Sequence, residues 1–141
     1  MQNVAVAIGE AAKRSGVKVP TIRYYEGIGL LPSPARTDGN RRQYDDADLR
    51  RLAFIRHARE LGFEVDAIRT LLALQDNRTQ SCAAADAIAS ARLEDVQQRI
   101  TSLLALKAEL QRMVAECAHG KVADCRVIEI LANHGECRHH H

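Results

Sequence analysis

The chain has 141 residues and a formal net charge of +2, and its hydrophobic and charged fractions, 46% and 27%, are typical of one or two small globular modules. No run approaches the roughly twenty apolar residues of a membrane span, and no signal-peptide pattern opens the chain. We therefore expect a cytoplasmic protein without a membrane partner. In that reducing compartment the four cysteines are expected to be metal ligands or core residues rather than disulfides.

The basic residues gather in the N-terminal part of the chain. Between Lys13 and Arg59, eleven lysines and arginines stand against five acidic residues, whereas the count is eight against eight from Asn77 onward. Contact with nucleic acid requires an excess placed in this way. Few aromatic residues, three prolines and a second half rich in Ala, Leu, Arg and Glu predict a mainly all-α fold with one small turn-rich region.

Two short helices joined by a tight turn are expected first. Apolar residues recur on one face of a helix over residues 6–15, which Gly16 ends. Pro20 suits the first position of a second helix over residues 21–27. This arrangement is a helix-turn-helix unit.

Residues 29–44 change character, because proline and an Asp38-Gly39-Asn40 turn interrupt them. They predict a small two-stranded wing with its tip near residues 37–40. Three arginines are expected to project from it: Arg36, Arg41 and Arg42.

Two further helices and a linker complete an expected DNA-binding module over residues 1–76. Asp45 can cap a helix that runs to about Leu61, with Asp48 in its first turn. A second helix is expected from Glu64 to about Gln75, and residues 77–81 form a polar linker.

Residues 82–117 contain no Pro or Gly and predict one long helix. Its apolar residues alternate at intervals of three and four if Lys107 counts as one polar member, and such a heptad seam needs a partner helix. We expect it to pair in a homodimer, because residues 118–141 are too few to cover it. They are expected to form a loop, a short helix over residues 126–132 and a tail. The apolar members of the seam are Leu93, Val96, Ile100, Leu103, Leu110, Val114 and Cys117.

Cys82 and Cys117 occupy the same heptad position, because they lie 35 residues apart. On one helix they would be about 50 Å apart at ~1.5 Å per residue, too far to share an ion. An antiparallel dimer brings Cys82 of one chain beside Cys117 of the other, and Cys125 closes the loop back toward Cys117. A parallel dimer would instead pair Cys82 with Cys82. The antiparallel arrangement predicts a three-thiolate site at each end of the dimer helix, suited to soft or borderline metals.

A compound motif runs through the second expected helix and the wing: Thr21-Ile22-Arg23-Tyr24-Tyr25-Glu26, Gly29-Leu30-Leu31, Pro32, Arg36, Arg42 and Tyr44. With the long helix and the cysteines, this motif resembles the MerR family of bacterial regulators over almost the entire chain. The small departure is Ala11, where the family usually has Leu.

The resemblance implies a winged helix-turn-helix that binds double-stranded promoter DNA as a dimer. On binding its effector the dimer bends and underwinds the DNA, which realigns two promoter elements for RNA polymerase. The second helix is expected to enter the major groove, and the other contacts to hold phosphates. The expected DNA-binding residues are Lys18, Arg23, Tyr24, Arg36, Arg42 and Tyr44, and the alternative for Tyr44 is that it packs under the wing.

The resemblance also implies metal sensing through Cys117 and Cys125, with Cys82 as the third ligand that divalent sensors carry. We therefore expect a divalent soft ion (Zn, Cd, Pb or Hg), with His119 as a possible nitrogen ligand, and metal-resistance or efflux genes as targets. The short cysteine loop and the Cys- and His-containing tail resemble monovalent Cu(I) or Ag(I) sensors, which is the first alternative. The second is a thiol-redox regulator. Nothing in the sequence supports an enzyme.

Overall fold

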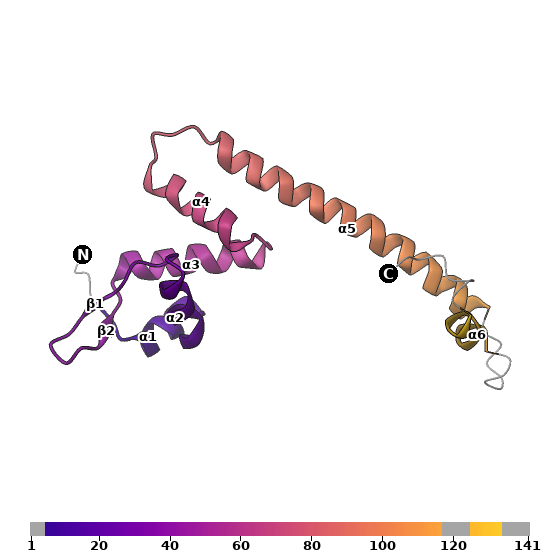
Figure 1. Ribbon diagram of the computed structural model, residues 1–141, viewed down its shortest axis with the longest axis horizontal. Helices are drawn as coiled ribbons and strands as arrows, with labels where there is room; N and C mark the ends of the chain where they lie inside the picture. Colours follow the sequence, from indigo (N-terminus) through magenta and orange to yellow (C-terminus); the bar gives the residue numbers. More distant parts are fainter. Residues whose placement is uncertain (1–4, 117–124, 134–141) are drawn as a thin grey trace. The chain divides into compact units, whose positions relative to one another are not determined.

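The computed structural model describes residues 5–116 and 125–133, and these are mostly helical, with one small antiparallel hairpin (Figure 1). They fall into two compact units, residues 1–89 and 90–141, which are treated separately below. Within the described ranges, no helix has the length and apolar character needed to span a membrane.

Helices α1 (Ile8–Ser15) and α2 (Val19–Gly27) form the predicted helix-turn-helix. Gly16 ends α1 with a φ of 74°, a left-handed conformation that glycine adopts without a Cβ penalty, and its N–H donates to the carbonyl of Ala12. Helix α1 begins two residues later than predicted, because Val6 forms a backbone bridge with Tyr44 instead of a helical turn.

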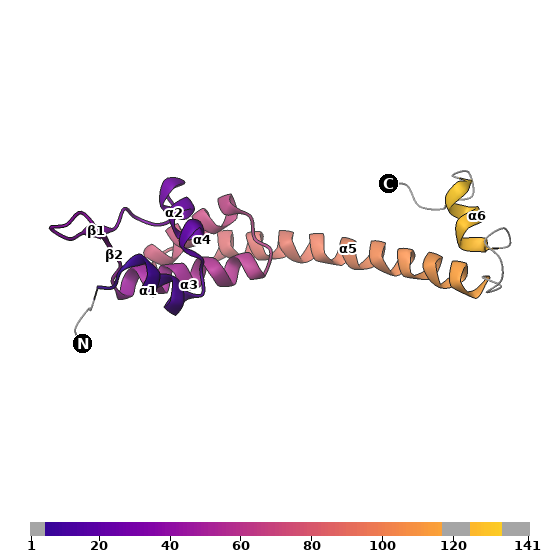
Figure 2. The same cartoon turned by 90° about the horizontal axis from the view of Figure 1, so that it is seen from below.

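Strands β1 (Ala35–Arg36) and β2 (Arg42–Gln43) form the wing, in a register that pairs Arg36 with Arg42. The tip lies where it was predicted. Asn40 has a φ of 62°, which asparagine tolerates better than most residues, and Thr37 accepts the N–H of Arg41. The hairpin projects beyond the helices of its unit in both Figure 1 and Figure 2.

Helices α3 (Asp46–Glu60) and α4 (Val65–Asp76) follow, with Gly62 in the turn between them. A capping box starts α3, because the Asp45 side chain accepts the N–H of Asp48 while the Asp48 side chain accepts the N–H of Asp45. The core of the unit draws on every one of these helices and on the segments between them. Its fully buried large side chains are Ile22, Leu30, Leu31, Tyr44, Leu52, Ile55, Ile68 and Leu72.

Helix α5 (Ala83–Ala115) is close to the predicted long helix, and α6 (Arg126–Ala132) has its predicted bounds. In the second unit, Met113 and Ile130 are buried, and Arg126 forms an ion pair with Glu116 at 2.9 Å. Most other apolar side chains of α5 are exposed. The most exposed are Leu93, Ile100, Leu103, Leu104, Leu110 and Val114.

Candidate nucleic-acid interface and metal-binding cysteines

The exposed face of α2 carries the residues predicted to enter the major groove. Ile22 and Tyr25 are buried and therefore fix the rotation of the helix, which leaves Arg23 and Tyr24 on the outside, with Tyr24 56% exposed. Lys18 is the N-cap residue of α2 and is also exposed. Positive side chains at this end add to the anion-attracting character of a helix N-terminus.

The wing supplies a second exposed basic surface. Arg36 is exposed, and its guanidinium donates to the carbonyl oxygen of Asn40 at 3.1 Å, which leaves other N–H groups of the fork available for an anion. Arg41 is exposed beside it at the tip. These two arginines and the α2 residues belong to the same compact unit.

Tyr44 requires a correction, because the structure places it inside the protein and not on a surface that faces DNA. It is 0% exposed, and its hydroxyl donates to the carboxylate of Glu26. Burial, and then the hydrogen bond to Glu26, raise the pKa of the Tyr44 hydroxyl, so that the phenol stays protonated. Tyr44 therefore supports the interface from within. Arg42 is only half-buried, but its Nε also donates to Glu26, at 3.0 Å.

Two arginines of α3 were not singled out from the sequence. Arg56 and Arg59 line a shallow depression together with Lys18 and Thr21 at the start of α2. Arg56 donates to the carbonyl of Ser15 at 3.3 Å, so that it lies against the turn of the helix-turn-helix. The sequence could have indicated them, because Arg56 and Arg59 lie about one helical turn apart. The helix predicted over residues 45–61 would have placed both on one face.

The cysteines described by the structure lie at helix starts. Cys82 is exposed immediately before α5, and its carbonyl accepts the N–H of Asp86 at 2.9 Å. Cys125 is partly exposed at the N-cap of α6, and its carbonyl accepts the N–H of Glu129 at 3.0 Å. Neither cysteine is part of a disulfide, and the two belong to different units.

The other predicted metal ligands, Cys117 and His119, lie outside the described residues, as do Cys137 and the histidines of the tail. Within residues 5–116 and 125–133, no three His, Cys, Asp or Glu side chains converge as a metal site would require. The shared three-thiolate site expected from the sequence draws ligands from two chains, so it stays a prediction.

The first unit is thus a winged helix-turn-helix with a basic outer face, which is the architecture of a DNA-binding protein. The family model described as "MerR HTH family regulatory protein" matches residues 6–75, and the model "MerR, DNA binding" matches residues 49–113. The chain is 41% identical over 128 residues to the HTH-type transcriptional regulator ZntR from Escherichia coli. The match covers 88% of this chain and 90% of that protein. The chain therefore belongs to the MerR family of DNA-binding transcription regulators.

Two similar solved structures hold metal ions. The transcription regulator PbrR691 from Ralstonia metallidurans, in complex with lead(II), has a TM-score of 0.78 and 37% identity, covering 89% of this chain and 98% of that one. MerR from Bacillus megaterium, in complex with mercury(II), has a TM-score of 0.68 and 30% identity, covering 91% and 100%. The resemblance seen in the sequence is confirmed, and the family is one of regulators and not of enzymes.

Proposed function

We propose that this protein is a metal-responsive regulator that binds promoter DNA in the cytoplasm as a homodimer and activates metal-resistance or efflux genes. The observation that carries the proposal is that one chain combines a winged helix-turn-helix that has exposed cations with two cysteines outside any disulfide. These are Cys82 and Cys125, at the starts of the two helices beyond it. The similar structures that hold lead(II) and mercury(II) support a metal as the signal.

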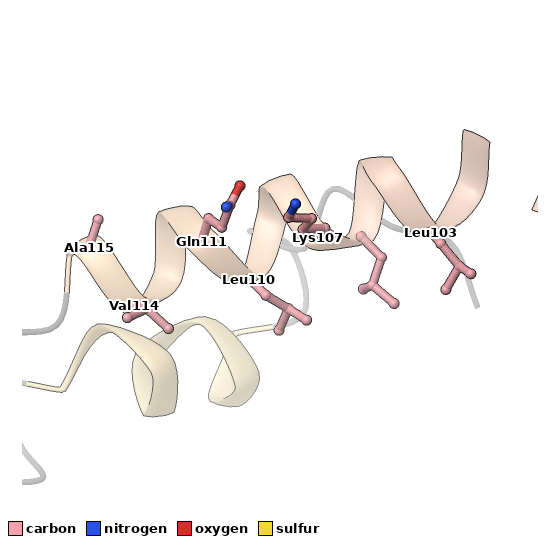
Figure 3. A pocket seen from close by; sticks show the side chains of 7 residues that line it. Leu103, Lys107, Leu110, Gln111, Val114 and Ala115 are labelled. Atoms are coloured by element: carbon pink, nitrogen blue, oxygen red, sulfur yellow. The ribbon is translucent and has the colours of Figure 1, made fainter. Parts of the chain in front are cut away.

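The exposed apolar face of α5 supports the dimer. Leu103 and Leu110 are 63% and 51% exposed and, with Val114, line an apolar groove along the helix (Figure 3). Lys107, the one polar member of the seam, lies in the same groove. Exposed leucines at heptad spacing over several turns are costly in water unless a second helix covers them. A second copy of α5 in antiparallel orientation is the partner that we propose.

The donor set fits a divalent soft ion. Three thiolates, Cys82 from one chain with Cys117 and Cys125 from the other, more than balance a 2+ charge and fill a site of more than two ligands, with His119 as a nitrogen donor. Zn, Cd, Pb and Hg are ions of this kind. Metal binding would bias the dimer toward a form that bends and underwinds its promoter, which realigns the promoter for RNA polymerase.

The test is a metal titration of the reduced, metal-free full chain with Zn(II), Cd(II), Pb(II), Hg(II), Cu(I) and Ag(I), followed by thiolate-to-metal absorption against a competing chelator. We expect tight binding of a divalent ion at two per dimer, weakened at least tenfold by Cys82→Ser. The matched control is Cys137→Ser, which removes a thiol outside the proposed site and is expected to leave that affinity unchanged.

Other outcomes would replace the proposal with a defined alternative. Tight Cu(I) or Ag(I) binding that is indifferent to Cys82→Ser would identify a monovalent sensor. No tight binding of any ion would contradict metal sensing. Loss of DNA binding on treatment with a disulfide-forming oxidant, restored by reductant, would then favour a thiol-redox regulator.

A further inference from the structure

Glu26 is a nearly buried carboxylate on the helix that is expected to enter the DNA. It lies in the last turn of α2, and its side chain is only 9% exposed. Oε1 accepts the hydroxyl of Tyr44, and Oε2 accepts Nε of Arg42 at 3.0 Å. A buried carboxylate is costly unless its oxygens are satisfied, and here each oxygen has a donor.

Both donors come from the base of the wing. Tyr44 is held rigidly, because its side chain is fully buried and its backbone exchanges two hydrogen bonds of 2.8 Å with Val6. Arg42 lies in β2 and pairs across the hairpin with Arg36. A carboxylate on α2 therefore joins the recognition helix to the hairpin that carries the exposed wing arginines.

We infer that Glu26 is a positioning residue for DNA binding. It fixes the wing cations, Arg36 and Arg41, relative to Arg23 and Tyr24 on α2, so that both groups reach the same operator. In this role Arg42 acts through Glu26, because its Nε donates to that carboxylate. The inference deepens the proposed DNA-binding function and rests on it.

The substitution Glu26→Gln separates this role from plain electrostatics, because the two predict opposite signs. Removal of a negative charge near phosphates would strengthen DNA binding if charge alone mattered. If Glu26 positions the wing, the weaker amide contacts release the hairpin and binding weakens. Tyr44→Phe is the second variant, because it removes the hydroxyl that donates to Glu26 without any change of charge.

The probe is a duplex that the reduced wild-type full chain selects from a randomised pool, with binding measured by fluorescence anisotropy from about 50 to 300 mM KCl. We expect Glu26→Gln and Tyr44→Phe to bind about tenfold more weakly. The slope of log affinity against log salt concentration should also fall, by an amount equivalent to about one to two phosphate contacts. A fold destabilised without loss of wing contacts would lower the active fraction and leave this slope unchanged.

The matched control is Glu10→Gln, which removes the same charge from an exposed carboxylate of α1 that pairs with Arg14 at 3.0 Å. We expect it to leave affinity and slope unchanged or to strengthen binding slightly. Adding Arg36→Ala to Glu26→Gln should cost little more than Glu26→Gln alone, because the wing contact is already lost.

The outcomes that would overturn the inference are distinct. If Glu26→Gln behaves as Glu10→Gln does, or if Glu26→Gln and Arg36→Ala act additively, Glu26 does not position the wing. Circular dichroism checks folding, and Tyr44→Phe decides the question if Glu26→Gln is unfolded. Failure of the wild-type chain to select any duplex would instead overturn the DNA-binding function itself.

Discussion

Gly16 combines two constraints at the turn of the helix-turn-helix. Its φ of 74° is left-handed, and a Cβ at this position would collide with the guanidinium of Arg56. We expect Gly16→Ala to lower the free energy of unfolding by about 1–2 kcal/mol, because a left-handed alanine is strained. The Arg56 side chain can move away, but only by giving up its bond to the carbonyl of Ser15. Urea denaturation of both proteins measures the difference.

Gly9 provides the control for that measurement. It lies within α1 with open space around its Cα, so Gly9→Ala should stabilise the helix slightly. Equal effects of the two substitutions would contradict the strain at Gly16.

Single residues also show which features of the interface the sequence could predict and which it could not. Arg23 and Tyr24 were predicted to face outward, and the apolar positions around them were enough to set the rotation of α2. Tyr44 was assigned to the DNA surface, yet it is buried. Its partner, Glu26, lies 18 positions earlier in the chain, so the contact that buries Tyr44 arises from tertiary packing and not from local pattern. Within α2, the charge of Glu26 was the one feature of the local sequence that pointed to such a partner.

At the scale of elements, the capping box of α3 links stability to pH. Burial, and then the nearby Asp45 carboxylate, raise the pKa of Asp48, while its hydrogen bond to the N–H of Asp45 opposes them. The folded chain thus holds this proton more tightly than the unfolded chain does. The contribution of Asp48 to stability is present in acid and is lost as the pH rises from the ordinary Asp value through the raised one.

Asp48→Asn should therefore raise the melting temperature at pH 7, because the amide oxygen can still accept the N–H of Asp45 without the charge repulsion. We expect the gain to shrink as the pH falls through the raised pKa of Asp48 toward the ordinary Asp value, because the wild-type carboxyl then takes up its proton. Asp45→Ala removes the N-cap acceptor instead and should cost about 1 kcal/mol at pH 7. Thermal melts between pH 4 and 8 test both substitutions, and a gain for Asp48→Asn that grows in acid would contradict the sign.

Element positions were predicted closely where local chemistry marks them. Helix α1 ends at Gly16 and helix α3 begins after Asp45, both as expected. The wing turns at Asp38-Gly39-Asn40, and Gly62 lies in the turn after α3, near the expected helix end. Ends without such marks shifted, as at α1, where the bridge of Val6 to Tyr44 removes two residues from the helix. That bridge joins segments far apart in sequence, so no local propensity encodes it.

At the scale of the whole molecule, the exposed seam of α5 makes dimerisation testable without metal. Leu103→Glu would place a charge in the proposed helix pair, and we expect the protein to sediment as a folded monomer. Because Leu103 is 63% exposed in the single chain, the substitution should leave the fold of the chain intact. Ala105→Glu, two positions along on the opposite side of α5, is the control and should remain dimeric. Monomeric wild-type protein would contradict the proposed pairing.

Heptad spacing specifies which positions face a partner, but it leaves the direction of the partner helix open. Mixed dimers decide that direction. We would combine a Cys82→Ser chain with a chain that carries Cys117→Ser and Cys125→Ser, and isolate mixed dimers through two different peptide tags. In an antiparallel dimer, one end keeps Cys82 from the second chain with Cys117 and Cys125 from the first, and the other end loses all three thiols.

The mixed dimer should then bind one divalent ion with wild-type affinity, although neither parent dimer holds a complete site. A set of all three thiolates within one chain, or a parallel pair joined at Cys82, leaves the mixed dimer with no complete site. If the mixed dimer binds no divalent ion with wild-type affinity, the shared antiparallel site is therefore wrong. Binding of one such ion would mean that the metal response belongs to the dimer, because each complete ligand set would come from two chains.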